Sequence, residues 1–184
     1  MRHPNAGVVG SCEGRSDSGD ENFYDVGDWM RLESRIFVAR APEVVGRWLG
    51  DVSNVAKWDR GVGDARVTSS GAMKVGTEFE TVGLPGARDG AGLRGRMGYR
   101  VAEVEGNRSV VELTSREGNA RYFRRASWEF RIEKVEGGST VICVADFEVK
   151  RRYWFLAPIL FFMKGAIHRD LEGLKRAVEA GTTG

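Results

Sequence analysis

Four polar side chains in this chain are candidates for chemistry inside an otherwise apolar interior. Tyr99, Tyr122 and Arg124 lie in segments that alternate apolar and polar residues, and His168 lies in an amphipathic segment near the C-terminus. A tyrosine or an arginine can donate hydrogen bonds to an oxygen atom on which negative charge develops, and a histidine or a tyrosine can transfer a proton. We therefore take these four residues as the candidate catalytic group.

The side of the sheet on which Tyr122 and Arg124 lie depends on where their strand becomes regular. Both share the parity of Ala126 and Trp128, so a regular strand points them inward, near one end of the interior. If the strand becomes regular only after Arg125, both side chains lie in solvent instead. The sequence leaves these two alternatives open.

The roles of Tyr99 and His168 also depend on whether each side chain is buried or solvated. Tyr99 shares a strand face with Val101, so its hydroxyl group needs a partner if the ring is buried. His168 lies about 60° off the apolar stripe of its helix, a position where a histidine is commonly solvated. The only other histidine is His3, so no Ser-His-Asp triad can be defended.

The residue pattern gives no support to metal, cofactor or disulfide chemistry. Cys12 lies in a polar segment and Cys143 in an apolar strand, so we expect neither a disulfide nor a metal site. Cys143 has no basic neighbour in sequence and is expected to be unreactive packing. The glycine-rich loop 84–95 lacks phosphate-binding spacing, and no cofactor is expected.

Length and charge predict one globular domain that does not bind nucleic acid. The chain has 184 residues and a formal charge of +2, with 41% hydrophobic and 29% charged residues. Its basic residues are interleaved with acidic ones, apart from pairs such as Arg124-Arg125 and Arg151-Arg152, and form no basic stripe. The N-terminus has no apolar segment typical of a secretory signal, so we expect a cytoplasmic protein.

Turn chemistry divides the chain into a tail and a strand-rich domain. Residues 1–28 are rich in Gly, Ser, Asp and Asn, which predicts a disordered tail ahead of a domain at 29–181. The domain opens with a strand at 34–40, a helix that begins at Pro42 and a second short helix that ends near Trp58. Further strands are predicted near residues 64–70, 76–83, 96–104, 109–115, 121–134 and 140–150.

The last two of these strands carry the clearest pattern. The inward residues of the first alternate with Ser127, Glu129 and Arg131, and those of the second follow after a glycine-containing turn. This predicts a hairpin with one buried face and one wet face. The inward set is Ala126, Trp128, Phe130 and Ile132 on one strand and Val141, Cys143, Ala145, Phe147 and Val149 on the other.

The apolar segment near the C-terminus is predicted to be a packing helix. Its apolar run from Tyr153 to Met163 is 11 residues long, whereas a membrane-spanning helix needs about 20. Beyond Pro158, which suits a first helical turn, the apolar residues fall within an arc of about 80°. A stripe this narrow requires a partner surface, and the sheet is the only large one. The stripe comprises Leu156, Leu160, Met163, Ile167, Leu171, Leu174 and Val178.

This order of elements resembles the START-like (SRPBCC) superfamily, and within it the polyketide cyclase/dehydrase-like proteins. Three segments carry the resemblance: "VARAPEVVGRWLGDVSNVAKWD", "GGSTVICVADFEV" and "LEGLKRAVEA". The resemblance implies an α+β helix-grip fold, in which a curved antiparallel sheet of about seven strands wraps around a long C-terminal helix. Gly46 departs from the pattern, since a larger, often aromatic residue is expected in the first helix.

The resemblance also implies a cavity between the sheet and the last helix that binds an apolar small molecule, aromatic, polyketide-like or lipid. If the protein is an enzyme, cyclisation, dehydration or isomerisation without a cofactor fits best. Arg124 or Tyr99 would then stabilise an enolate, and His168 or Tyr122 would move a proton. The expected ligand-binding residues, each of which can equally fill the core, are Trp58, Phe79, Trp128, Phe130, Cys143, Phe147, Leu160, Met163 and Ile167.

Two non-catalytic functions stay open beside this one. The first is a carrier or sensor for a lipid or quinone, in which aromatic residues outside the stripe form a peripheral membrane or homodimer surface. These residues are Trp154, Phe155, Phe161 and Phe162. The second is a chaperone-type cofactor, which predicts a protein partner and no pocket ligand.

Overall fold

The computed structural model describes residues 29–69, 74–84, 95–116, 118–156 and 163–181. The expected N-terminal tail, residues 85–94 of the predicted loop and Leu160 lie outside these ranges. Phe161 and Phe162 lie outside them as well. The division into a tail and a domain at residue 29 stays a prediction.

Seven antiparallel strands form one sheet, in the order β1-β7-β6-β5-β4-β3-β2. Each consecutive pair from β2 to β7 is adjacent, and β1 closes the far side by pairing with β7. The strands are β1 Trp29–Val38, β2 Val62–Val67, β3 Glu78–Gly83, β4 Arg96–Glu105, β5 Arg108–Leu113, β6 Phe123–Val135 and β7 Gly138–Val149. The β4–β5 and β6–β7 turns contain Gly106 and Gly137 at positive φ, a conformation that glycine adopts without a Cβ penalty.

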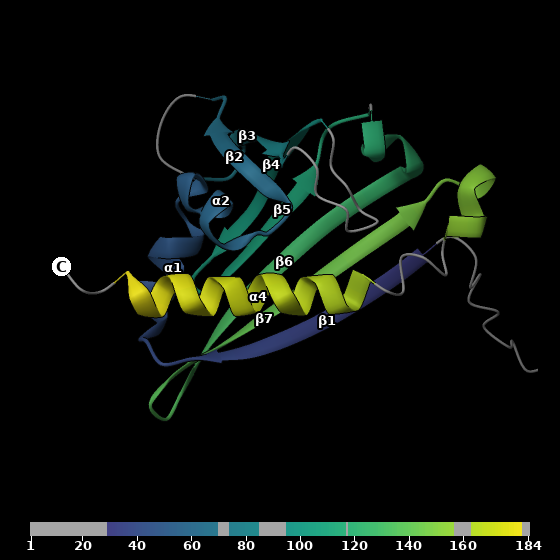
Figure 1. The fold of residues 1–184 in the computed structure, drawn as a ribbon. Helices are drawn as coiled ribbons and strands as arrows, with labels where there is room; N and C mark the ends of the chain where they lie inside the picture. Colours follow the sequence, from purple (N-terminus) through teal and green to yellow (C-terminus); the bar gives the residue numbers. More distant parts are fainter. Residues whose placement is uncertain (1–28, 70–73, 85–94, 117, 157–162, 182–184) are drawn as a thin grey trace, which may run out of the picture.

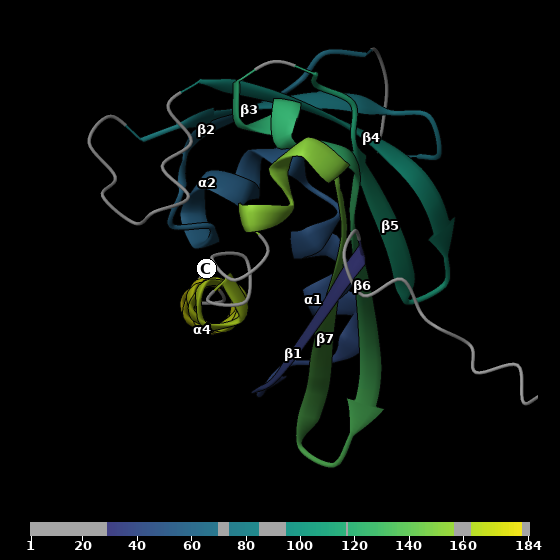
Figure 2. The ribbon, with the colours of Figure 1, turned by 90° about the vertical axis from the view of Figure 1, so that its right-hand side faces the viewer.

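The sheet curves around the C-terminal helix α4, Met163–Ala180 (Figure 1). Seen along the axis of α4, the strands form an open arch with the helix at its mouth (Figure 2). The short helices that follow β1 lie between the helix and one wall of the arch. The predicted α+β helix-grip architecture, with seven strands and two short helices after the first, is therefore confirmed.

Helix α4 packs on the sheet through one stripe of side chains. Ile167, Leu171, Leu174 and Val178 follow the i, i+4, i+7, i+11 spacing, and each is at most 7% exposed. Leu156, which was expected to belong to the same stripe, lies in a separate 3₁₀ helix, η3, Arg151–Leu156. None of the helices in the described part of the chain has the length and hydropathy that crossing a membrane requires.

The β6–β7 hairpin has the predicted register. Trp128 lies opposite Ala145, and Phe130 lies opposite Cys143, on the face that α4 covers. The prediction that the other face is simply wet was wrong, because Ile142 and Val144 point outward and are still buried. Their cross-strand neighbours on both sides are charged, and the aliphatic parts of such side chains can cover apolar surface.

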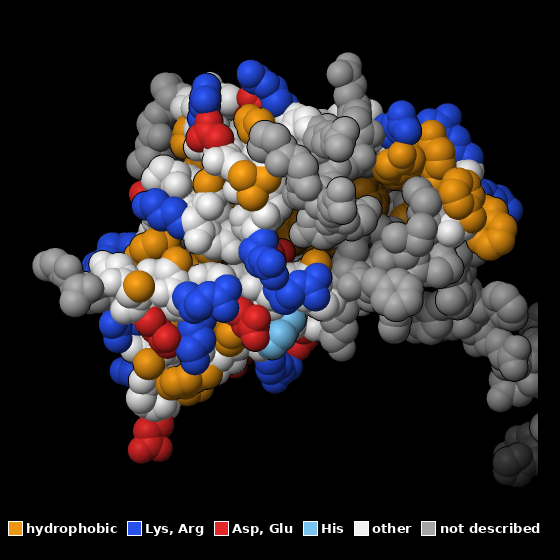
Figure 3. Space-filling view, viewed as in Figure 1, with side chains coloured by type: hydrophobic (Ala, Val, Ile, Leu, Met, Phe, Trp, Pro, Cys, Tyr) orange, Lys and Arg blue, Asp and Glu red, His pale blue; other side chains and the backbone are white. Residues whose placement is uncertain are grey.

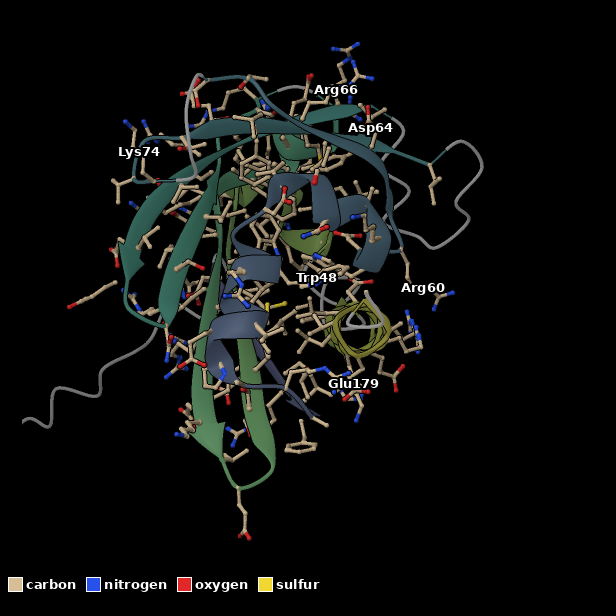
Figure 4. All side chains as sticks on the ribbon, turned by 90° about the vertical axis from the view of Figure 1, so that its left-hand side faces the viewer. Trp48, Arg60, Asp64, Arg66, Lys74 and Glu179 are labelled. Atoms are coloured by element: carbon tan, nitrogen blue, oxygen red, sulfur yellow. The ribbon has the colours of Figure 1, made fainter. Side chains whose placement is uncertain are left out.

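The short helices between β1 and β2 pack against both the sheet and α4. Helix α1, Pro42–Leu49, begins at a proline and buries Val45 against the sheet. Its Trp48 faces the end of α4, where a β-carbon on Gly181 would lie 2.9 Å from the indole ring (Figure 4). The chain then forms a 3₁₀ turn, η1 Val52–Asn54, and the single turn α2 Val55–Trp58. A further 3₁₀ helix, η2 Gly118–Tyr122, precedes β6.

Candidate functional site

A chain of aromatic contacts lines the inner face of the sheet. The ring of Tyr99 stacks on Phe79 at a centroid distance of 5.2 Å and meets Trp128 edge-on at 5.6 Å. Trp128 in turn meets Phe147 edge-on at 5.6 Å. These residues come from β3, β4, β6 and β7, because antiparallel pairing places alternate residues of each strand on the concave side.

Several of these inward side chains are not sealed by their neighbours. Phe147 is only 1% exposed, whereas Tyr99, Trp128 and Phe130 on the same face are half-buried. Burial raises the pKa of Tyr99 to about 12, an effect that a hydrogen bond with Thr81 opposes in part. Tyr99, Trp128 and Phe130 therefore keep accessible surface, although they lie on the concave face of the sheet.

Trp58 brings a polar edge to this aromatic surface. Its ring meets Phe130 edge-on at 6.1 Å, and its carbonyl oxygen lies against Gly173 of α4, where a β-carbon would approach it to 2.3 Å. The indole Nε1 is buried, and no described residue accepts a hydrogen bond from it. An unpaired buried donor costs about 1–3 kcal/mol, so this N–H is a position at which a bound molecule could supply an acceptor.

The close contact between Trp58 and Gly173 brings two carboxyl groups together. Asp59 follows Trp58, and the backbone N–H of Arg60 lies 3.4 Å from Oδ1 of Asp170, one turn before Gly173. Burial, and then the negative charge of Asp59, raise the pKa of Asp170 to about 7. A carboxyl group with this pKa is present in both protonation states near neutral pH and can act as an acid or as a base.

Both carboxyl groups also act electrostatically on residues of the sheet. The charge of Asp59 acts on Tyr99, and the charge of Asp170 acts on Cys143 of β7. Burial raises the pKa of the Cys143 thiol to about 12, which removes the nucleophilic thiolate at neutral pH. The polar site cluster is therefore Trp58, Asp59, Tyr99 and Asp170, set among aromatic rings with an inert thiol beside them.

A surface groove adjoins this cluster where α2 meets α4. It has a volume of about 390 Å³, and Trp58, Asp59 and Gly173 are among its lining residues. Arg60, at its outer edge, points away from the helix (Figure 4). Within the described ranges no three His, Cys, Asp or Glu side chains lie close enough together to hold a metal ion.

Of the two alternatives left open for Arg124 and Tyr122, the structure has the second, in which the strand is regular only from Arg125 and neither side chain points into the interior. The β6–β7 register shifts between Phe123 and Arg125, so Arg124 is the extra residue of a β-bulge. It points outward and forms an ion pair with Glu148 at 2.9 Å. Tyr122 lies in η2 before the strand begins, and its ring packs on Tyr153 at 5.0 Å rather than in the interior.

His168 lies on the flank of α4, as predicted, and its side chain is exposed. Nδ1 lies 3.0 Å from Oγ of Ser34 on β1, and Nε2 lies 3.9 Å from a carboxylate oxygen of Glu172. The imidazole thus links α4 to the edge strand β1, and its assignment to the catalytic group stays a prediction.

The remaining residues that were expected to bind a ligand fall into two groups, those with accessible surface and those that are buried. Trp58, Trp128 and Phe130 keep accessible surface on the inner face, whereas Phe79, Cys143, Phe147 and Ile167 are buried behind it. Met163 begins α4, but its side chain, like all of Leu160, lies outside what the structure describes. The assignment of these residues to ligand binding stays a prediction.

Asp170 is the residue that the sequence interpretation missed. It lies three residues after Ile167 and four before Leu174, so it borders the same helical stripe that packs on the sheet. An acidic residue at the margin of such a stripe is the signal that could have identified it. For the adjacent pair Trp58-Asp59, the sequence interpretation included the tryptophan in the lining and gave the carboxyl group no role.

Residues 30–179 match the sequence profile of the family described as polyketide cyclase / dehydrase and lipid transport. The chain belongs to this family. The match extends from β1 to the last turn of α4, so it includes every strand and helix of the START-like fold described above. A comparison with curated proteins found no significant match.

Solved structures of other proteins share this fold at low sequence identity. A protein from Thermus thermophilus has a TM-score of 0.66 at 16% identity, covering 84% of this chain and 100% of its own. A START superfamily protein from Mycobacterium smegmatis has a TM-score of 0.65 at 16% sequence identity, and the alignment covers 83% of this chain and 99% of that protein. The Zhui aromatase/cyclase of Streptomyces sp. R1128 has a TM-score of 0.65 at 12% sequence identity, and the alignment covers 82% of this chain and 94% of that protein.

Proposed function

We propose that this START-like protein binds an apolar, aromatic or polyketide-like carbonyl compound between the concave face of the sheet and α4, and catalyses its cyclisation or dehydration. The aromatic surface of Tyr99, Trp128 and Phe130 would hold planar or extended apolar groups. The site cluster would act on the carbonyl end of the compound. The family description and the aromatase/cyclase fold neighbour support this substrate class.

The chemistry follows from the protonation states of two groups. Asp170, as the carboxylate, removes a proton from a carbon next to a carbonyl, and the electron pair moves onto the carbonyl oxygen. The protonated Tyr99 hydroxyl, held neutral by its raised pKa, donates a hydrogen bond to that oxygen. The resulting enolate attacks a second carbonyl, and Asp170 returns its proton to the alkoxide that forms. Loss of water from this product then needs the same acid and base and no redox partner.

One observation carries this proposal: Asp170, a carboxyl group with a pKa of about 7, is partly buried where α2 meets α4, beside Asp59, whose charge also acts on the desolvated Tyr99. The nearby Trp58 N–H would donate to a polar atom of the ligand and so gain the partner that it lacks among the described residues. Orientation of a flexible chain by the aromatic wall would supply the remaining rate enhancement.

The test is a pair of measurements on the same compounds. Dihydroxyanthraquinone and a linear aryl triketone are titrated into the protein by fluorescence quenching, and turnover of the triketone is followed by chromatography. We expect binding of both compounds, and turnover that falls at least about a hundredfold in Asp170→Asn while binding persists. Binding without turnover in the wild-type chain would support the rival function, a non-catalytic carrier. No binding of either compound would contradict the proposal altogether.

A further inference from the structure

We propose that the end of the molecule built by η2 and η3 docks onto an anionic membrane surface. This surface, here called the tip, is distinct from the site cluster and does not depend on the proposed chemistry. The tip comprises Arg121, Tyr122, Lys150, Arg151, Arg152, Tyr153, Trp154 and Phe155.

Large aromatic side chains protrude from the tip. Trp154 is 65% exposed and Phe155 is 56% exposed, although both are among the most apolar residue types. Figure 3 shows hydrophobic side chains bordered by Lys and Arg at the end of the molecule where Figure 1 places η3. Tryptophan in particular favours the interface between water and lipid, because its ring is apolar and its N–H is polar.

Contacts between η2 and η3 hold this surface in shape. The rings of Tyr122 and Tyr153 meet edge-on at 5.0 Å, and Phe155 continues the row at 6.4 Å from Tyr153. Arg121 lies over the ring of Tyr122 at 4.9 Å, and Arg152 lies over that of Tyr153 at 4.8 Å. The aromatic groups are therefore presented by a fixed scaffold and lose little freedom when they bind.

Basic residues predominate around the tip, with the acidic residues Glu117 and Glu148 flanking it in the sequence. Segments 118–128 and 149–156 contain six basic residues and no acidic residue. In the adjoining part of β7, Glu148 forms an ion pair with Arg124. Each basic residue held near an anionic bilayer adds about fivefold to the affinity, so the tip combines aromatic anchors with attraction to lipid phosphate groups.

The same charge argues against a second copy of the chain as the occupant. In a two-fold symmetric contact through the tip, Arg151 and Arg152 of one copy would face the same residues of the other. Such like-charge contacts destabilise an interface, whereas an anionic lipid surface neutralises them. A membrane is thus the partner that fits both the exposed rings and the charge.

Vesicle co-sedimentation tests the proposal directly. The full chain is mixed with vesicles of phosphatidylcholine alone, or of phosphatidylcholine with phosphatidylglycerol, at low and high salt. We expect binding to the anionic vesicles that weakens with salt, since salt screens the charges. The double variants Trp154→Ala/Phe155→Ala and Arg151→Gln/Arg152→Gln should each bind about tenfold more weakly or less.

Matched controls lie at other parts of the surface. Phe37→Ala removes another exposed ring, at the opposite end of β1, and Arg47→Gln/Arg66→Gln removes the same charge from α1 and β2. Retained binding in these controls supports the tip. Equal losses in tip and control variants, or no binding of the wild-type chain to anionic vesicles, would overturn the proposal. A dimer in sedimentation velocity that disappears in Trp154→Ala/Phe155→Ala would overturn it as well.

Discussion

The carbonyl oxygen of Trp58 lies against Gly173 so closely that a β-carbon at that position would be 2.3 Å from it. This contact brings the end of α2 onto α4 and sets Asp59 beside Asp170. The site cluster thus depends on a glycine in a helix interior, where glycine is otherwise unfavourable. We infer that Gly173 is present because the approach of the two backbones requires it.

Two glycine-to-alanine variants should therefore have opposite effects. Gly173→Ala is expected to lower the free energy of unfolding by about 2 kcal/mol, since backbone atoms must move to admit the methyl group. Gly46→Ala, in α1, should raise it by about 0.5–1 kcal/mol, because its β-carbon would lie 3.7 Å from Ile132, an ordinary contact. Urea unfolding of both variants checks this. A stabilised Gly173→Ala would contradict the account of the site.

The raised pKa of Asp170 predicts how stability depends on pH. A carboxyl group whose pKa rises on folding, here from 3.8 to about 7, binds more protons in the folded state than in the unfolded state between those values. Its contribution to stability is therefore present at low pH and is lost as pH rises from about 4 to about 7. Asp170→Asn should remove this loss.

The comparison is made by urea unfolding of the wild-type chain and Asp170→Asn at pH 5 and pH 8. The variant should gain stability relative to the wild type at pH 8 more than at pH 5. Asp64→Asn, on β2, serves as a control, because Asp64 is a surface residue in an ion pair with Arg66. A difference between wild type and Asp170→Asn that does not change with pH would contradict the assigned pKa.

Trp128 and Phe147 touch each other but should respond differently to truncation. Phe147 is 1% exposed, so Phe147→Ala is expected to cost about 3–5 kcal/mol of stability. Trp128 keeps accessible surface on the inner face, so Trp128→Ala should cost less stability while it weakens binding of dihydroxyanthraquinone about tenfold or more. A stability loss at Trp128 equal to that at Phe147, with unchanged binding, would mean that Trp128 only fills the core.

Substitution of His168 or Arg124 is expected to leave ligand binding and turnover almost unchanged. Both side chains are exposed and engaged elsewhere, His168 with Ser34 and Arg124 with Glu148. We expect His168→Ala and Arg124→Ala to retain ligand affinity and turnover within about twofold, in contrast to Asp170→Asn. A large loss of turnover in either variant, with the fold intact by circular dichroism, would restore that residue to the candidate catalytic group.

The sequence predicted the inward side chains of β6 where the strand pattern is regular, and left them open where it is not. Regular alternation along Ala126, Trp128, Phe130 and Ile132 determines which side chains face α4, and the structure has that register. Whether the strand is regular at Arg124 stayed open, because one inserted residue reverses the side of the sheet without changing the composition. The position of Tyr122 stayed open for a related reason, since the chain is still in η2 at Tyr122 and enters the strand only at Phe123.

The grouping of residues in the site cluster could not be predicted from any single segment of the sequence. The pKa of Asp170 depends on burial by the sheet and on the charge of Asp59, more than 100 residues earlier in the chain. That proximity follows from the Trp58–Gly173 contact, which only the folded chain displays. The aromatic lining, by contrast, could be predicted, because large rings at inward positions of a regular strand pattern must face the interior.

The five tryptophans allow the central claim to be tested in one experiment. Each indole N–H gives its own signal in a proton–nitrogen correlation spectrum, which single Trp→Phe variants assign. If dihydroxyanthraquinone binds between the sheet and α4, the signals of Trp58 and Trp128 will shift with saturation, while those of Trp29, Trp48 and Trp154 will not. Shifts confined to Trp29 and Trp154, or unchanged signals of Trp58 and Trp128 at saturating ligand, would contradict the claim that this interior is the binding site.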